Sequence, residues 1–175
     1  MAKTRYVALL RGVNVAGRGK VNMGDLRDVF TGLGYADVAT YIQSGNVVFT
    51  SDARVVAGAI ERGIEADLGM NVTVVLRTAV QLTRVVRRNP FTDVDTSKVH
   101  VGFMAGRPAA AAVRSLDRGR FSPDEFVVDG IELYLHVPNG IGRSKLPDYL
   151  ARQLKVPTTI RNWNTVTKLV DMVSA

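Results

Sequence analysis

The sequence contains no cysteine. This absence excludes disulfide bonds, thiol nucleophiles, CxxC redox chemistry and cysteine-ligated zinc sites. Only two histidines are present, so His100 and His136 are the sole imidazole groups available for acid–base or metal chemistry. A chain without disulfides is typical of reducing compartments, and we expect a cytoplasmic protein with no metal or other cofactor.

Long apolar runs are also lacking. No segment approaches the ~18 consecutive apolar residues that a membrane-spanning helix needs. Residues 1–4 lead directly into the strand-like segment 6–10, without the cleavage region of a signal peptide. We therefore expect neither secretion nor membrane insertion. A hydrophobic content of 46% with few aromatic residues predicts an aliphatic core, enough for one domain or for two small ones.

Acidic residues are the minority among the charges. The chain has 23 Lys and Arg against 16 Asp and Glu, a formal net charge of +7. The basic residues are not gathered in a tail, because they recur beside glycine and asparagine in expected loops and on one helix flank. A general excess of arginine that keeps the protein soluble explains this pattern, and we favour it over a dedicated surface for polyanions.

The first 77 residues predict the element order β-α-β-β-α-β. Asn22 is expected to cap the first helix and Gly69 to end the second. Ser44 and Gly45 lie between two strand patterns and predict a tight hairpin. The predicted strands are 4–10, 38–43, 46–50 and 71–77, and the predicted helices are 22–34 and 56–68.

The same order is predicted again after a connecting helix, in which Thr78 and Gln81 form a capping box. The predicted strands are 98–104, 125–128, 131–137 and 158–161, and the predicted helices are 108–116, 145–154 and 164–173. Segment 74–86 also aligns without gaps on 158–170, with Arg77 opposite Arg161. We predict an α+β protein built by tandem duplication of ferredoxin-like halves, 1–77 and 98–175, with a connecting helix and linker at 78–97.

A glycine-rich loop follows the first strand at residues 11–21. Its glycines have the spacing of a P-loop, but Arg18 and Gly19 stand where Lys and Ser/Thr are required, and the helix begins only near Asn22. We therefore favour a packed or flexible connecting loop. The alternative is an anion-binding nest that uses Arg11, Arg18 and Lys20.

A second loop, residues 139–145, leads into a helix that Ser144 could cap. Exposed amides, the positive end of a helix and the cations Arg143 and Lys145 are the ingredients of a phosphate site. The spacing matches neither GxGxxG nor the P-loop. A glycine-rich turn with an N-cap explains the glycines and Ser144 but leaves both cations unexplained, so the two interpretations stay open.

Two further features carry polar chemistry. The only tryptophan, Trp163, lies within Arg161–Asn164 at a strand-to-helix junction. Asn162 or Asn164 is expected to cap the helix, but a guanidinium, an aromatic ring and two amides also suit a base or a sugar. His100 and His136 fall in neighbouring strands, which allows a two-histidine site, although ordinary sheet-surface histidines are the favoured interpretation.

Four segments, LRGVNVAGRGKVNMGDL, YIQSGNVVF, GIGRSKL and RNWNTVTKL, resemble those of a bacterial family known as domain of unknown function 1697. The resemblance covers nearly the whole chain. It implies a duplicated ferredoxin-like fold and no particular reaction. The polar signature positions correspond here to our candidate ligand-binding residues: Arg11, Asn14, Lys20, Gln43, Ser44, Asn46, Arg143, Ser144, Lys145, Arg161, Asn162, Trp163 and Asn164.

Most of these candidates donate hydrogen bonds, whereas paired carboxylates and nucleophile–base pairs are lacking. The leading hypothesis is a non-catalytic protein whose loops bind a phosphate-bearing ligand, either a nucleotide or a nucleic-acid segment. One alternative is a small enzyme that uses Asp25, Asp148 or a histidine as general base. The other is a structural or partner-binding module without a ligand.

The expected geometry depends on strand direction. We expect the first and third strands of each half to be parallel neighbours, which would separate Arg11 and Asn14 from the turn at Gln43–Asn46. The same rule places Arg143 beside the loop after the second half's first strand, and Arg161–Asn164 toward that half's hairpin. Arg161–Asn164 is then expected beside a polar motif of the first half, in a cleft between the halves. Both sheets are expected to be covered on both faces.

Overall fold

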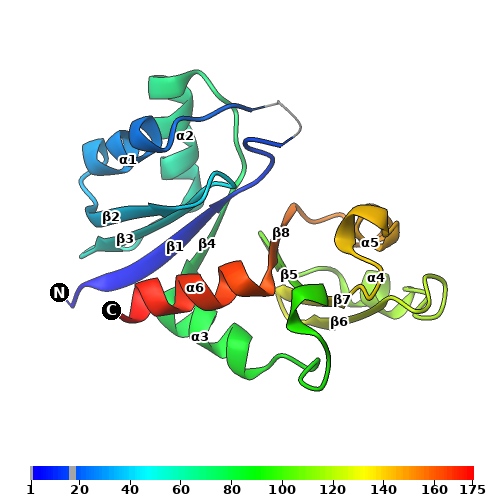
Figure 1. The fold of residues 1–175 in the computed structure, drawn as a ribbon. Helices are drawn as coiled ribbons and strands as arrows, with labels where there is room; N and C mark the ends of the chain where they lie inside the picture. The colour runs from blue at the N-terminus through cyan, green and yellow to red at the C-terminus, as the bar shows by residue number, and fades with distance from the viewer. Residues whose placement is uncertain (1, 16–18) are drawn as a thin grey trace. The chain divides into compact units, whose positions relative to one another are not determined.

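The computed structural model describes residues 2–15 and 19–175 (Figure 1). It shows an α+β protein with two four-stranded antiparallel sheets, ordered β2-β3-β1-β4 and β6-β7-β5-β8. The strands are β1 (Thr4–Leu10), β2 (Ala36–Tyr41), β3 (Asn46–Ser51), β4 (Val74–Thr78), β5 (Val99–Met104), β6 (Glu125–Asp129), β7 (Glu132–His136) and β8 (Thr158–Asn162). The α-helices of the described residues are α1 (Met23–Gly32), α2 (Ala57–Leu68), α3 (Ala79–Arg87), α4 (Ala110–Arg114), α5 (Leu146–Leu154) and α6 (Trp163–Ser174). Two short 3-10 helices, η1 (Thr96–Lys98) and η2 (Ile141–Arg143), lie in loops.

The chain divides into two compact units. The first unit is Met1–Arg84 with Lys168–Ala175, and the second is Val85–Thr167. The division therefore falls inside α3 and inside α6, so each of these helices contributes to both units. The boundaries of the units therefore differ from those of the expected halves, 1–77 and 98–175.

In the first unit, α1 and α2 cover one face of the sheet (Figure 1). α1 begins where the sequence predicts, because the Asn22 side chain accepts hydrogen bonds from the backbone N–H groups of Gly24 (2.8 Å) and Asp25 (3.2 Å). α2 ends at Gly69, whose φ of 65° is left-handed. The core between helices and sheet includes Ala8, Leu10, Phe30, Phe49, Ile60 and Ile64.

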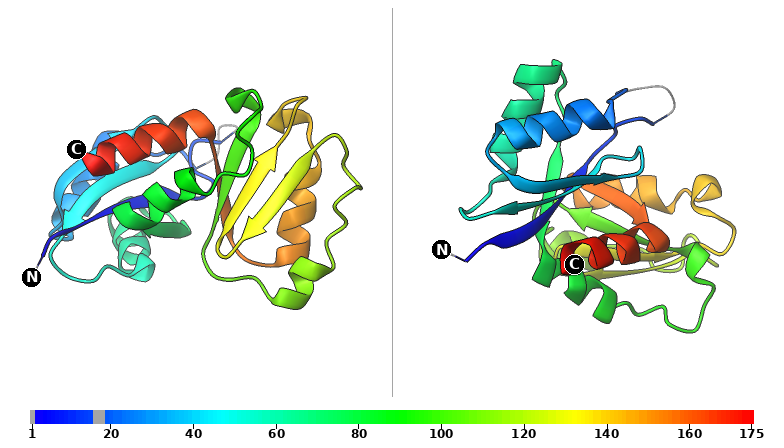
Figure 2. Two further views of the ribbon diagram at one scale, coloured as in Figure 1. Left: turned by 90° about the horizontal axis from the view of Figure 1, so that it is seen from below. Right: turned by 60° about the vertical axis from the view of Figure 1, so that its left-hand side comes forward.

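In the second unit, α4 and α5 cover one face of the sheet (Figure 2). This core includes Met104, Leu135, Leu146, Tyr149 and Leu150. On the other face, the Tyr134 hydroxyl donates a hydrogen bond of 2.8 Å to the Val85 carbonyl of α3. α4 is shorter than predicted and starts at Ala110, so Pro108 lies before the helix and not in its first turn.

Strand direction corrects one expectation. β1 and β3 are antiparallel neighbours, and so are β5 and β7. The reason is that the helical crossover makes β1 and β2 run the same way, and β3 returns from β2 through a hairpin to lie between them. The expectation of parallel first and third strands was therefore wrong, and so were the loop positions deduced from it.

The two units repeat the same register as well as the same element order. Val7 pairs with Arg77 in the first sheet, and Val101 pairs with Arg161 in the second. Both arginines are buried, and each donates a hydrogen bond to the carbonyl of the residue before it, at 2.8 Å and 3.1 Å respectively. The gap-free alignment of segments 74–86 and 158–170 thus corresponds to equivalent positions in space.

The residue after each arginine caps the helix that follows. Thr78 Oγ1 accepts from the Gln81 N–H at 3.2 Å, and Gln81 Oε1 accepts from the Thr78 N–H at 2.9 Å, which completes the predicted capping box of α3. Asn162 Oδ1 accepts from the Thr165 N–H at 2.8 Å in α6. Of the two asparagines considered as caps, Asn162 makes the bond.

The central strands of both sheets are largely buried. All six residues of β3 and all six of β5 are buried, as are Val7, Ala8, Leu9 and Leu10 of β1. The prediction that both sheets are covered on both faces holds for these central strands, whereas the edge strand β2 has no buried residue. None of the helices in residues 2–15 and 19–175 has the length and apolar character needed to cross a bilayer.

Candidate functional site

The glycine-rich loop and the β2–β3 turn of the first unit meet at Asn14. Its side-chain amide donates to the carbonyls of Gln43 (2.6 Å) and Val21 (3.3 Å), and its Oδ1 accepts from the Val21 N–H at 2.9 Å. Asn14 has a φ of 53°, a left-handed conformation that asparagine tolerates better than most residues. The expectation that Asn14 and the turn lie apart was wrong, because antiparallel pairing brings the end of β1 beside the start of β3.

The turn itself is held by Asn46 and Gly45. Asn46 is fully buried, and its amide donates to the Tyr41 carbonyl and to Ser44 Oγ, both at 2.9 Å. Gly45 has a φ of 82°, and a Cβ atom there would lie 2.5 Å from a methyl group of Val13. A glycine is therefore required both by conformation and by space. These contacts give Asn14, Ser44 and Asn46 a structural role in fixing the loop pair.

A cavity of about 500 Å³, the Asn14 pocket, lies beside this junction. It is lined by Asn14, Lys20, Val21, Asn22, Met23 and Gln43. The side chains of Lys20 and Gln43 are exposed. The Asn22 side chain already accepts hydrogen bonds from the backbone N–H groups of Gly24 and Asp25 in the first turn of α1. These N–H groups therefore do not point at a ligand, as they do in a P-loop. Arg18, the third member of the proposed anion nest, lies outside the described residues.

The loop after β7 forms a second site, in the second unit. Gly140 has a φ of 92° and starts the turn that becomes η2. Ser144 Oγ then accepts from the Leu146 N–H at 3.1 Å and donates to Asp124 Oδ2 at 2.6 Å. Ser144 therefore supports the start of α5 as expected and also binds the loop that precedes β6.

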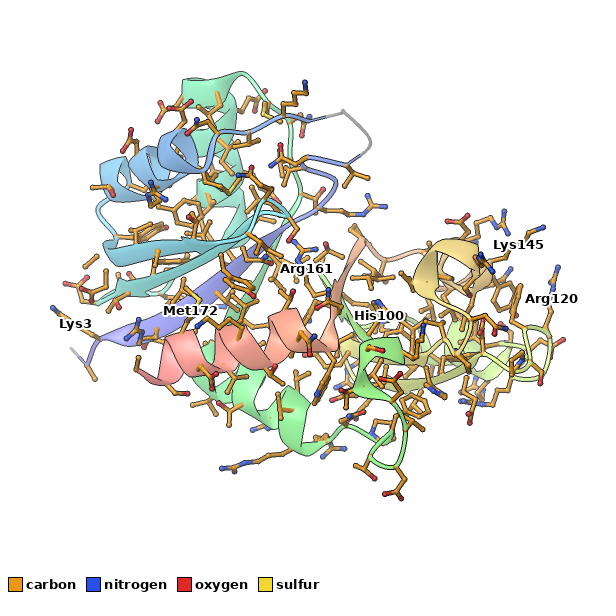
Figure 3. The ribbon with its side chains drawn as sticks, viewed as in Figure 1. Lys3, His100, Arg120, Lys145, Arg161 and Met172 are labelled. Atoms are coloured by element: carbon orange, nitrogen blue, oxygen red, sulfur yellow. The ribbon has the colours of Figure 1, made fainter. Side chains whose placement is uncertain are left out.

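A cavity of about 420 Å³, the Arg143 pocket, lies between these two loops. One wall is Phe121–Asp124, before β6, and the other is formed by residues 139–145, after β7. Arg143 and Lys145 are exposed, and Lys145 extends outward in Figure 3. No side-chain hydrogen bond or ion pair within the described parts of the chain engages either cation.

Antiparallel pairing also corrects the expected positions in this unit. His136 at the end of β7 pairs with Val99 at the start of β5, so the Arg143 loop leaves at the opposite end from the loop after β5. Asn162 at the end of β8 pairs with His100, which likewise places Arg161–Asn164 at the end of the sheet away from the β6–β7 hairpin. The described lining of the Arg143 pocket includes none of Arg161–Asn164.

The segment Arg161–Asn164 is largely occupied by structural contacts. Arg161 is 7% exposed, and its guanidinium donates to Thr159 Oγ1 at 2.6 Å. Burial lowers the pKa of Arg161 to about 10. Trp163 is half-buried as the first residue of α6, and Asn164 is exposed. The expectation that this segment lies beside a polar motif of the first half stays a prediction.

The histidines do not form a pair. His100 lies opposite Leu135, whereas His136 lies opposite Val99, so their side chains point to opposite faces of the sheet. Burial lowers the pKa of His100. His136 packs against Phe91, with ring centroids 5.6 Å apart, and its Nδ1 is 3.6 Å from Glu125 Oε1. In the described parts of the chain, no group of three His, Asp or Glu residues is placed to hold a metal ion.

Residues 3–134 match the family described as "Protein of unknown function (DUF1697)". The chain belongs to this family. Among solved structures it is similar to the conserved bacterial protein SP0830 from Streptococcus pneumoniae, with a TM-score of 0.80 and 26% sequence identity over 99% of this chain and 100% of that chain. No curated protein matches the chain. The family membership expected from the signature segments is confirmed.

The DUF1697 signature segments thus fall into three places. Within the matched range, the described residues 11–15 and 19–20 meet segment 43–46 around Asn14, while segments 143–145 and 161–164 lie beyond residue 134. Sequence reasoning missed Phe121 and Asp124, which form the second wall of the Arg143 pocket. A signal for them existed, because the loop entering a hairpin and the loop leaving it must lie at the same end of a sheet.

Proposed function

We propose that this protein binds a phosphate-bearing ligand, a nucleotide or a nucleic-acid segment, in the Arg143 pocket. The observation that carries the proposal is the pair of exposed cations, Arg143 and Lys145, beside a cavity of about 420 Å³ and without a side-chain partner in the described residues. Binding cavities for small ligands are typically about 300–1,000 Å³. A guanidinium and an ammonium are the groups that proteins commonly use for phosphate oxygens.

The Arg143 pocket is favoured over the Asn14 pocket for a physical reason. Among the described lining residues of the Asn14 pocket, Lys20 is the one cation, and the asparagine side chains are engaged in holding the loop and capping α1. In the Arg143 pocket two cations flank Ser144, whose hydroxyl fixes the loop through Asp124. A fixed loop presents its cations at a smaller entropic cost on binding.

We also infer that the two halves are ferredoxin-like and arose by tandem duplication. The strand orders β2-β3-β1-β4 and β6-β7-β5-β8 support this, because both have the third strand between the first and second. The equivalent buried arginines and the helix caps that follow them give further support. A duplicated scaffold of this kind implies no particular reaction.

The proposal is tested by titrating the protein with sodium pyrophosphate in a calorimeter. For an Arg143→Ala/Lys145→Ala variant we expect the affinity to fall by about tenfold or more per cation, because each charge-assisted hydrogen bond contributes about 1.5–3 kcal/mol. Binding to the parent should also weaken between about 50 mM and about 200 mM salt. The melting temperature without ligand should stay close to that of the parent, since exposed cations add little to stability.

The matched control is Arg87→Ala/Arg152→Ala, which removes two exposed cations from α3 and α5 of the same unit and changes the net charge equally. This control should bind pyrophosphate about as well as the parent. Equal affinity of the Arg143→Ala/Lys145→Ala variant and the control would contradict the proposal.

A further inference from the structure

The geometry points to a nucleoside phosphate as the ligand of the Arg143 pocket, with its base on Phe121, its ribose at Asp124 and its phosphate at Arg143 and Lys145. This inference rests on the proposed function and adds the chemical class of the ligand. It follows from three chemically different surfaces that line one cavity.

The first surface is aromatic. Phe121 is half-buried and lines the cavity next to Ser122 and Pro123. Its ring is tilted by 50° against the Tyr149 ring of α5, with centroids 5.0 Å apart, and the Arg120 guanidinium lies over the Phe121 ring, 5.5 Å from its centroid. The ring is therefore held by a tilted aromatic contact and by a cation over one face, and its other face is the surface that we propose for a planar group.

The aromatic surface is preorganised by its own loop. The Asp117 carboxylate accepts from the N–H groups of Gly119 and Arg120, both at 3.1 Å. The Tyr149 hydroxyl accepts from the Asp117 N–H at 2.8 Å, which ties this turn to α5. The Phe121 carbonyl then accepts from the Asp124 N–H at 2.9 Å. Phe121 is thus presented by a turn that is fixed at both ends.

The second surface is a carboxylate. Asp124 Oδ2 accepts the Ser144 hydroxyl at 2.6 Å, which joins the two walls of the cavity. Within the described residues, Oδ1 takes no hydrogen bond, and Asp124 is only half-buried. A carboxylate beside a phosphate site repels the phosphate itself, but it accepts hydrogen bonds from sugar hydroxyls, as acidic residues do in dinucleotide sites.

The third surface is the pair of cations on the opposite wall. A ligand that satisfies all three surfaces needs a planar apolar part, neighbouring hydroxyl groups and a phosphate. Inorganic phosphate lacks the first two, and a sugar phosphate lacks the planar part. A nucleoside phosphate has all three.

The test compares AMP, ribose 5-phosphate and pyrophosphate by calorimetry on the full chain. The parent should bind AMP more tightly than ribose 5-phosphate by roughly tenfold, because stacking of one base on an aromatic ring has about that effect. Phe121→Leu, which keeps an apolar side chain against Tyr149, should lower the affinity for AMP to that for ribose 5-phosphate. It should leave the affinity for pyrophosphate unchanged. Asp124→Asn, whose amide oxygen still accepts the hydrogen bond from Ser144, should lower the affinities for AMP and for ribose 5-phosphate together. It should not lower the affinity for pyrophosphate.

The outcomes separate the two proposals. If AMP and ribose 5-phosphate bind the parent with equal affinity while the binding of pyrophosphate requires Arg143 and Lys145, the phosphate site is supported and the nucleoside inference is overturned. If none of the three probes binds, both proposals fail. If Phe121→Leu keeps the full preference for AMP, with circular dichroism and melting temperature like those of the parent, the base does not lie on Phe121 and the inference is overturned.

Discussion

Single asparagines give the first unit its loop geometry. Asn14 joins the loop after β1 to the turn before β3 through one hydrogen bond to Gln43, and it holds Val21 of its own loop through two more, from a left-handed backbone conformation. The sequence marked Asn14 as a candidate ligand-binding residue. The structure shows instead how fully its amide is engaged in holding the chain.

Replacing Asn14 by Ala should lower the free energy of unfolding by about 2–3 kcal/mol, because it removes these hydrogen bonds and places a Cβ in a left-handed conformation. Asn14→Gly should cost less, about 1–2 kcal/mol, since glycine adopts that conformation without strain. Urea unfolding followed by circular dichroism measures both. Gln43→Ala is the control and should be near neutral, because Asn14 bonds the Gln43 backbone carbonyl and not its side chain. Parent-like stability of Asn14→Ala would refute this role.

Helices and strands were the features that the sequence predicted best. Asn22, Gly69 and the Thr78–Gln81 capping box set helix ends within a residue or two of the observed ones. These signals succeed because a cap is a local contact between residues two to four positions apart. Strand direction was mispredicted, because alternation along a strand shows which residues are buried but not which way its neighbour runs.

The cap of α6 gives a test for one element. Asn162→Ala should destabilise the protein by about 1 kcal/mol, because Asn162 Oδ1 accepts the Thr165 N–H. Asn162→Asp should be close to the parent, since aspartate caps equally well. Asn164→Ala serves as the control: its exposed side chain makes no cap bond, and we expect almost no change. A larger loss in Asn164→Ala than in Asn162→Ala would show that the cap is assigned to the wrong residue.

For the whole molecule, the sequence predicted the α+β class, the repeated element order and the family, but not the Arg143 pocket. The sequence indicated Arg143 and Lys145 because a glycine-rich turn gives these two cations no structural role. It did not indicate Phe121 and Asp124, because Phe121 contacts Tyr149 of α5 and Asp124 contacts Ser144, at separations of 28 and 20 residues. Contacts of that range depend on how the hairpin and the helix pack, and the predicted hairpin indicates only that the loops before and after it lie at the same end of the sheet.

The most direct test of the central claim is an NMR titration of the isotope-labelled full chain with AMP, following the backbone amide resonances. We predict that the largest chemical-shift changes fall in residues 121–124 and 139–145, the two walls of the Arg143 pocket, and that they are lost in the Arg143→Ala/Lys145→Ala variant. Absence of any change in these two segments, or the largest changes around Lys20 and Gln43 of the Asn14 pocket, would contradict the account.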